Sequence, residues 1–314
     1  MDDYSKKKIS QDILKFEKSY REDDKSPMNA LLLKDKRLAI VYSNNYLVIL
    51  NPNRLDNTSS AIKFSPHAKN FLDISVFPDG RLLTYTSDGE VKIWRVEEKS
   101  CECEYILQVR VEEGSCNITA LSNNRIATAV RDFQINIWST LEPFASLGYL
   151  EGHKGWVEIM LQPEGKEILI SASSDKTLRV WELVKYEQVK CFSGVNCLFK
   201  NSMGFYDENT VMVQSTNHTL KFINFETFKV RETSNEKWLV ENVVCILRLD
   251  NGLIIFEFRR NSTIGIYNER EDKFIFSNIY DSKYSIKALV RTNDYKLIFI
   301  HKEKVDLYSY RQFV

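Results

Sequence analysis

Glycine, proline and cysteine are scarce in this sequence, and neither sign of charge is in excess. Its 314 residues include 11 Gly, 6 Pro and 6 Cys, and 43 basic residues balance 43 acidic ones. A formal net charge of zero gives no long-range attraction to nucleic acid or to an anionic membrane surface. The cysteines contain no C-x-x-C pair, and a disulfide framework is not expected in so large a chain, so we expect reduced thiols.

Long hydrophobic runs are absent as well. No stretch approaches about eighteen consecutive apolar residues, so no transmembrane helix is expected. The N-terminus, Met1 to Lys8, is polar and charged, and the apolar segment of a secretory signal does not follow it. We therefore expect a cytoplasmic or nuclear protein that is not secreted.

A four-residue pattern recurs through the chain: an apolar residue, any residue, an apolar residue, then a large residue. The last residues of its seven copies are Leu50, Trp94, Trp138, Trp181, Ile223, Tyr267 and Tyr308. Successive copies are 41 to 44 residues apart. A four-stranded propeller blade repeats about every 40–45 residues, so the spacing predicts seven blades.

A strand and a tight turn precede each copy of the pattern. In the second copy, residues 81–86 lead through Ser87-Asp88-Gly89 into Val91, and Asp and Gly both favour hairpin turns. Short strands of alternating polarity predict an all-β fold. Because a four-stranded sheet cannot bury both faces alone, we expect a seven-bladed β-propeller of four-stranded antiparallel blades, occupying residues 28–314.

The two ends of the chain are expected to close this ring together. Only six residues follow Tyr308, too few for another outer strand, so a different segment must supply it. Residues 13–20, within an N-terminal segment 1–27, are the candidate, because a closed ring leaves no open sheet edge. The same residues could instead form a short helix, since three of their apolar side chains share one helical face.

The fourth copy resembles the WD-repeat (WD40) β-propeller family. It contains Gly152-His153, Trp156-Val157, Ser171-Ala172-Ser173-Ser174-Asp175 and Val180-Trp181. In that family a His, a Ser or Thr, an Asp and a Trp form a hydrogen-bond chain within each blade, and a buried indole N–H needs such a partner. The resemblance implies this structural role for His153, Ser171, Asp175 and Trp181.

The other copies match the family less well. Copies two and three keep the hydroxyl, the acid and the tryptophan, as Thr84, Asp88 and Trp94 and as Thr128, Asp132 and Trp138. Neither has a histidine in register, although His67 lies close to the expected place. Copies one, five, six and seven keep only the apolar pattern. The family motif is therefore complete in one copy and partial in two, while the period covers nearly the whole chain.

Catalytic motifs are missing: the sequence has no nucleophile elbow, P-loop, zinc-binding helix motif or dinucleotide fingerprint. His153, Ser171 and Asp175 could suggest a hydrolytic triad, but their spacing fits the WD network, so a propeller-based hydrolase is only an alternative. The four histidines lack metal-ligand spacing, so neither a metal nor a cofactor is expected. They are His67, His153, His218 and His301.

A second alternative rests on two adjacent arginines. Phe258-Arg259-Arg260-Asn261 resembles the F-R-R-G motif of phosphoinositide-binding propellers, and a guanidinium fork binds phosphate bidentately. In that family the motif lies on an outer strand that leads into the next blade. Here Arg259 and Arg260 stand just before the hairpin turn of copy six, and Asn261 replaces the glycine. Two arginines on a solvated strand end are the simpler interpretation.

The resemblance implies a protein-binding scaffold or adaptor rather than an enzyme. In the family, partners usually dock on the face that carries the hairpin turns and the starts of the innermost strands. On that face we expect Arg131, Arg260 and His301 to supply positive charge, and Trp156 and Phe71 to supply apolar anchors, because Trp and Arg are frequent hot-spot residues. The expected ligand is an acidic or phosphorylated peptide, bound by a monomeric propeller within a complex.

Overall fold

The computed structural model describes most of the chain. The described residues are 14–55, 59–68, 71–109, 117–129, 133–233, 242–258, 264–271, 273–277, 286–292 and 294–310. For residues 71–72, 273 and 275–277 only the backbone is described.

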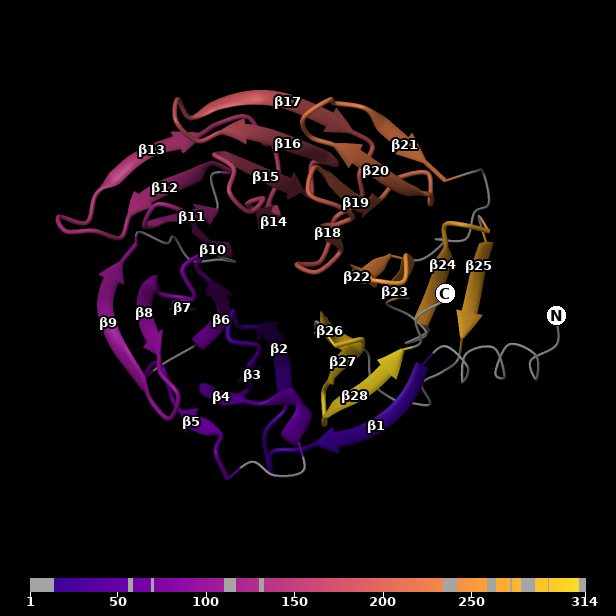
Figure 1. Ribbon diagram of the computed structural model, residues 1–314. Coiled ribbons are helices and arrows are strands. Elements are labelled where there is room, and N and C mark those ends of the chain that lie inside the picture. Colours follow the sequence, from indigo (N-terminus) through magenta and orange to yellow (C-terminus); the bar gives the residue numbers. More distant parts are fainter. Residues whose placement is uncertain are drawn as a thin grey trace.

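Seven four-stranded antiparallel sheets stand as blades around a common axis (Figure 1). The prediction of an all-β, seven-bladed propeller is confirmed. Blades one to three, each from the innermost strand outward, are β2 (Pro27–Leu32), β3 (Leu38–Tyr42), β4 (Tyr46–Leu50) and β5 (Ile62–Phe64); β6 (Phe71–Val76), β7 (Leu82–Thr86), β8 (Glu90–Val96) and β9 (Cys101–Gln108); and β10 (Asn117–Leu121), β11 (Arg125–Ala129), β12 (Ile135–Ser139) and β13 (Ser146–Leu150).

The remaining blades have the same strand order. Blades four to six are β14 (Val157–Leu161), β15 (Ile168–Ser173), β16 (Thr177–Glu182) and β17 (Glu187–Ser193); β18 (Met203–Phe205), β19 (Thr210–Gln214), β20 (Leu220–Asn224) and β21 (Val230–Glu232); and β22 (Val243–Arg248), β23 (Leu253–Phe258), β24 (Ile264–Asn268) and β25 (Lys273–Ser277). Blade seven is β26 (Ile286–Arg291), β27 (Lys296–His301), β28 (Val305–Tyr310) and β1 (Leu14–Tyr20). A single 3-10 turn, η1 (Pro52–Arg54), follows β4 among the described residues.

The N-terminal strand closes the ring, as the sequence predicted. β1 pairs antiparallel with β28, from Leu14 opposite Tyr310 to Tyr20 opposite Val305, so these residues form a strand rather than the alternative helix. The Ser19 hydroxyl also donates to the Asp306 carboxylate. Figure 1 shows β1 running along the outer side of β28, where it covers the edge that blade seven would otherwise expose.

The core lies between neighbouring blades rather than within any one of them. Leu38 and Ile40 of blade one pack with Ile298 and Ile300 of blade seven, and all four are 0% exposed. Equivalent clusters join the other neighbouring pairs. Both faces of each middle strand are therefore buried, which explains why these strands are continuous apolar runs in the sequence. Each fully buried aliphatic side chain of this size contributes about 1.5–3 kcal/mol relative to an exposed one.

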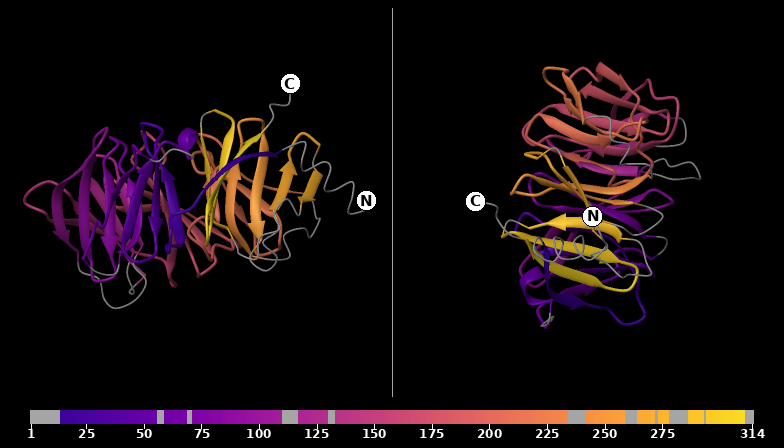
Figure 2. Two further views of the ribbon diagram at one scale, coloured as in Figure 1. Left: turned by 90° about the horizontal axis from the view of Figure 1, so that it is seen from below. Right: turned by 90° about the vertical axis from the view of Figure 1, so that its right-hand side faces the viewer.

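Two faces of the ring follow from this topology. Figure 2 shows the ring edge-on, with the strands running between the two faces. We call the top face the one where the innermost strands begin and where the second and third strands of each blade are joined. The bottom face is the one where the innermost strands end and turn into the second strands. Within the described part of the chain, no helix is long and apolar enough to cross a membrane.

Candidate functional site

The most complete polar network lies inside blade four. Trp181 Nε1 donates to Ser171 Oγ at 2.8 Å, and His153 Nε2 lies 2.7 Å from the same oxygen. His153 Nδ1 lies 3.0 Å from Asp175 Oδ2. Burial lowers the pKa of His153, so the ring is neutral at neutral pH. These contacts join the segment before β14 to β15, to β16 and to the turn between those two strands.

Asp175 holds this network from the β15–β16 turn. Burial alone would raise the pKa of Asp175, but hydrogen bonds from Thr177, from the Lys154 amide and from His153 lower it to about 2. The Lys154 amide donates to Asp175 Oδ2 at 2.8 Å. A Cβ added to Gly155 would lie only 2.8 Å from the Asp175 nitrogen, so this position requires glycine for the segment to pack on the turn.

The contact distances in blade four are similar to those of a serine–histidine–aspartate triad. However, Ser171 is 0% exposed, and its hydroxyl is shared between His153 and the Trp181 indole. A serine nucleophile must reach its substrate, and burial closes that approach here. The arrangement favours a structural role for these side chains over a hydrolytic one.

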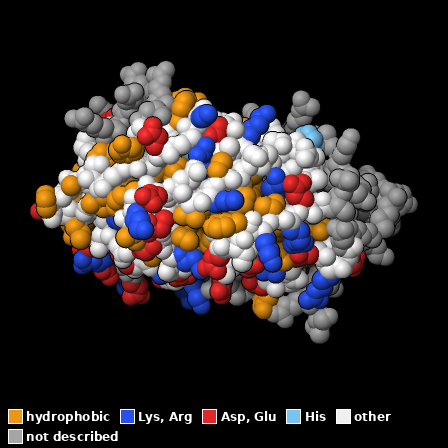
Figure 3. Space-filling view, turned by 90° about the horizontal axis from the view of Figure 1, so that it is seen from above, with side chains coloured by type: hydrophobic (Ala, Val, Ile, Leu, Met, Phe, Trp, Pro, Cys, Tyr) orange, Lys and Arg blue, Asp and Glu red, His pale blue; other side chains and the backbone are white. Residues whose placement is uncertain are grey.

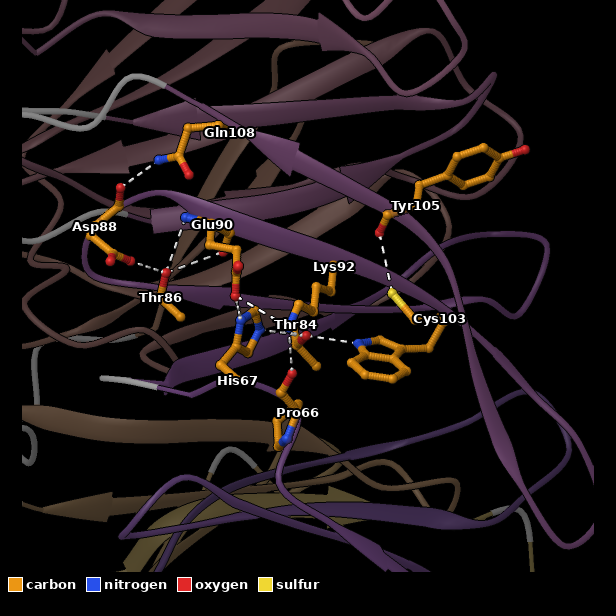
Figure 4. A network of polar contacts seen from close by, with 11 residues as sticks. Pro66, His67, Thr84, Thr86, Asp88, Glu90, Lys92, Cys103, Tyr105 and Gln108 are labelled. Carbon is orange, nitrogen blue, oxygen red and sulfur yellow. Dashed lines mark hydrogen bonds and ion pairs between the residues drawn. The ribbon is translucent and has the colours of Figure 1, made fainter.

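Blade two holds an equivalent network that the sequence analysis placed only in part (Figure 4). Trp94 Nε1 donates to Thr84 Oγ1 at 2.8 Å, and His67 Nε2 lies 2.7 Å from that oxygen. His67 Nδ1 lies 2.6 Å from Glu90 Oε1. His67 is one residue closer to its tryptophan in the sequence than His153 is, yet it occupies the same place in its blade.

The acid of the blade-two network is Glu90, which corrects the assignment of Asp88. The Asp88 carboxylate accepts a hydrogen bond from the Thr86 hydroxyl inside the β7–β8 turn. Glu90 begins β8, and its longer side chain reaches the imidazole of His67 from there. The hydrogen bond with His67 lowers the pKa of Glu90, while burial lowers the pKa of His67.

The remaining blades keep less of the network. In blade three, Trp138 Nε1 donates to Thr128 Oγ1 at 2.9 Å, and Asp132 lies outside the described residues. In blade six, Phe256 pairs with Gly265, and a Cβ on that glycine would lie 2.0 Å from the Phe256 ring. Aromatic packing therefore fills the space that the polar network occupies in blade four.

An aromatic pair lies on the top face between blades three and four. Trp156, just before β14, is partly buried, and its ring contacts Phe133 edge-to-face with centroids 6.0 Å apart. The Trp156 carbonyl accepts the Ser174 amide at 2.8 Å, which fixes the segment against the neighbouring turn. Lys154 and Lys176, in the same blade, are exposed, and neither ammonium group has a carboxylate partner among the described residues.

The other residues predicted to bind a partner have different outcomes. Arg131 and Arg260 lie outside the described residues, as does Arg259 of the phosphoinositide-like motif. Phe71 begins β6 and pairs with Thr86 on the top face, but its side chain also lies outside the described part. Their expected place beside Trp156 therefore stays a prediction.

His301 is buried, which corrects its assignment to the exposed rim. Its residue is 1% exposed, its ring stacks on Phe299 with centroids 6.3 Å apart, and its Nε2 lies 3.6 Å from Asp306 Oδ2. Burial lowers the pKa of His301 to about 4. The reason is its place at the end of β27, where the side chain turns into the blade, so it supplies no positive charge to the rim.

Cavities lined by described residues also open on the bottom face, for which the sequence predicted no site. One cavity of about 390 Å³ lies among the innermost strands of blades one to four. Another, of about 620 Å³, is lined by residues at the bottom ends of blades four, five, six and seven. Lys34 Nζ lies 3.7 Å from Glu164 Oε1, an ion pair that joins blades one and four at the smaller cavity. Arg248 and Arg291 line the larger cavity. Each ends an apolar run just before a turn, a signal that could have identified them.

Metal binding receives no support from the described residues, which contain no group of three or more His, Cys, Asp or Glu side chains placed to hold an ion.

Two stretches of the chain are similar to a known protein repeat. The model of the WD domain, G-beta repeat, matches residues 59–95 and 144–182, which include the networks of blades two and four. A guanine nucleotide-binding protein subunit beta-like protein of Encephalitozoon cuniculi is 26% identical over 135 residues, which cover 41% of this chain and 39% of that protein. Lissencephaly-1 homolog 1 of Paramecium tetraurelia is 36% identical over 84 residues, or 26% of this chain and 20% of the relative.

A third relative, Cross-pathway control WD-repeat protein 2 of Flammulina velutipes, is 33% identical over 87 residues, or 26% of this chain and 28% of the relative. The matched segments thus span 20 to 39% of the length of these three relatives. The chain is thus a seven-bladed β-propeller in which two stretches match the WD repeat.

Proposed function

We propose that this chain is a non-catalytic scaffold that binds a partner protein on its top face, at the junction of blades three and four. The observation that carries the proposal is the Trp156–Phe133 pair, in a region that also holds Lys154 and Lys176, two exposed lysines without carboxylate partners in the described part of the chain. Aromatic anchors near cationic side chains are typical of interface hot spots. An acidic or phosphorylated peptide is the ligand that this combination fits best.

The proposal that the chain is not an enzyme rests on the blade-four network. The serine, histidine and aspartate with triad-like distances in blade four are held inside the blade, with the serine fully buried. The matched WD repeats support a binding role by resemblance, because WD-repeat propellers commonly act as interaction platforms.

The test is affinity capture of the tagged chain from its native cells, read by mass spectrometry. The informative variant combines Trp156→Ala with Lys154→Glu. Its matched control combines Tyr149→Ala with Lys185→Glu, an exposed aromatic residue on β13 and an exposed lysine in the β16–β17 turn.

Figure 3 views the rim over β13, β17 and β21, where hydrophobic and charged side chains of both signs are interspersed.

A stoichiometric protein that the control retains and the Trp156 variant loses would support the proposal. A partner retained equally by both variants would remove the top-face site. Equal melting temperatures of the two variants would show that a difference in partner binding is not caused by a difference in folding.

A further inference from the structure

The larger bottom-face cavity contains an arginine whose charge is not compensated within the described structure. Arg248 ends β22 and lines this cavity of about 620 Å³. Its guanidinium lies over the Tyr206 ring, 4.4 Å from the ring centroid. No carboxylate pairs with it among the described residues, and its Nε is buried without a hydrogen-bond acceptor.

Two other arginines in contact with this region, Arg231 over the same Tyr206 ring and Arg291 against the Arg248 backbone, do have carboxylate partners. Arg231 Nη2 lies 2.6 Å from Glu269 Oε1, and Arg291 Nη1 lies 2.9 Å from Asp250 Oδ1. Arg291 also donates to the Arg248 carbonyl at 3.1 Å. Both of these arginines thus pair with carboxylates, whereas Arg248 has an aromatic contact and no ion pair among the residues that the structure describes.

A buried donor without an acceptor is unfavourable, and the penalty is larger when the group is charged. An acceptor on a bound ligand would remove this penalty at the Arg248 Nε. The stacking on Tyr206 holds the guanidinium in one orientation, so little freedom is lost when a planar acceptor pairs with its fork. Phe205, at the side of the cavity, is 37% exposed and offers an apolar contact to the same ligand.

The other charged side chains of the cavity favour a carboxylate over a phosphate as the group that binds Arg248. Asp207 and Glu208 are exposed on its wall, and neither has a cationic partner among the described residues. A doubly charged phosphate at Arg248 would be repelled by them, whereas a singly charged carboxylate would be repelled less. The same two acids attract basic side chains that flank the bound carboxylate.

We propose that this cavity binds an aspartate or glutamate side chain of a partner protein at Arg248, with basic residues beside it facing Asp207 and Glu208. The site lies on the face opposite to Trp156. It therefore adds a second partner surface to the proposed scaffold and stands or falls independently of the first.

The test uses random twelve-residue peptides displayed on phage, selected on the whole purified chain. Enriched peptides are synthesised, and their affinities are measured by fluorescence anisotropy for wild type, Arg248→Gln, Arg248→Lys and Trp156→Ala. The matched control is Arg270→Gln, an exposed arginine in the β24–β25 turn whose side chain makes no ion pair among the described residues.

We expect enriched peptides with an acidic residue next to basic ones. Arg248→Gln should weaken them about tenfold or more, as for loss of a charge-assisted bidentate pair, and Arg248→Lys should weaken them less. Arg270→Gln and Trp156→Ala should bind as wild type does. Lack of enrichment, enriched peptides without an acidic residue, or equal binding to Arg248→Gln would overturn the proposal.

Two further measurements keep the result specific. A phosphoserine in place of the acidic residue should bind more weakly, and tighter binding would overturn the carboxylate assignment. Arg248→Met should keep or raise the melting temperature of the free chain, because it removes an uncompensated charge. A large fall would instead show that Arg248 is needed for folding and would count against a ligand-binding role.

Discussion

The indole nitrogen of Trp94 donates to the hydroxyl of Thr84 at 2.8 Å, in a blade whose sequence shows only part of the WD motif. The same hydroxyl lies 2.7 Å from His67. A single side chain thus serves two buried partners from different parts of blade two. Blade three has the indole contact alone among its described residues, through Thr128.

This difference predicts that replacing the threonine by valine destabilises the chain more in blade two than in blade three. Thr84→Val removes an oxygen that contacts both the Trp94 and His67 nitrogens, and Thr128→Val removes one that contacts the Trp138 nitrogen. We expect losses in the free energy of unfolding of about 2–3 kcal/mol and about 1 kcal/mol respectively, from the cost of unsatisfied buried groups. Urea denaturation of the two variants measures this, and equal losses would show that His67 contributes nothing through Thr84.

Glu257 predicts a pH dependence of stability. It is 0% exposed on β23, its Oε1 accepts the Ile286 amide at 2.6 Å, and burial raises its pKa to about 8. A free glutamate has a pKa of about 4.3, so the folded chain holds a proton that the unfolded chain has released between these values. Stability therefore falls as the pH rises through this window.

Glu257→Gln stays neutral and should remove that loss. We expect it to match wild type near pH 5 and to exceed it at pH 8.5 by about 2 kcal/mol, the order of a buried charged group without a full set of partners. Burial also raises the pKa of Asp306 to about 6, which acts in the same direction but is common to both proteins. Melting curves at the two pH values decide, and parallel pH profiles would count against the prediction.

Ring closure by β1 predicts a sharp effect of truncation. A chain that begins at residue 21 loses Leu14 and Tyr20, 3% and 6% exposed, and uncovers the edge of β28. We expect a loss of about 3–6 kcal/mol from burial alone, together with association through the open edge. Gel filtration and thermal unfolding measure both effects, and a chain that begins at residue 14 is the matched control. A stable monomer after the longer deletion would contradict the closing role of β1.

The fold could be predicted from the sequence because it depends on a period. Seven apolar patterns at 41 to 44 residues require only alternation and spacing, and these are visible in a single chain. The blade-four network was equally accessible, because His153, Ser171, Asp175 and Trp181 stand at the family spacing.

The details of single side chains were less accessible. The choice of Glu90 over Asp88 depends on which residue of a turn can reach His67, and turn geometry rather than spacing decides it. His301 was expected on the rim because it ends a strand, yet its ring turns inward onto Phe299. The sequence around Arg248 indicated its role only weakly. That role depends on Arg231 and Arg291, which lie in other blades and pair with the nearby carboxylates.

The most direct test of the scaffold proposal is the affinity between the purified chain and its purified captured partner, measured by isothermal titration calorimetry for wild type and Trp156→Ala. Loss of a hot-spot aromatic costs about 2 kcal/mol or more, so we expect binding at least about 30-fold weaker, with Tyr149→Ala unchanged. Unchanged affinity in Trp156→Ala, or turnover of the partner by the wild-type chain, would contradict a non-catalytic scaffold that binds through its top face.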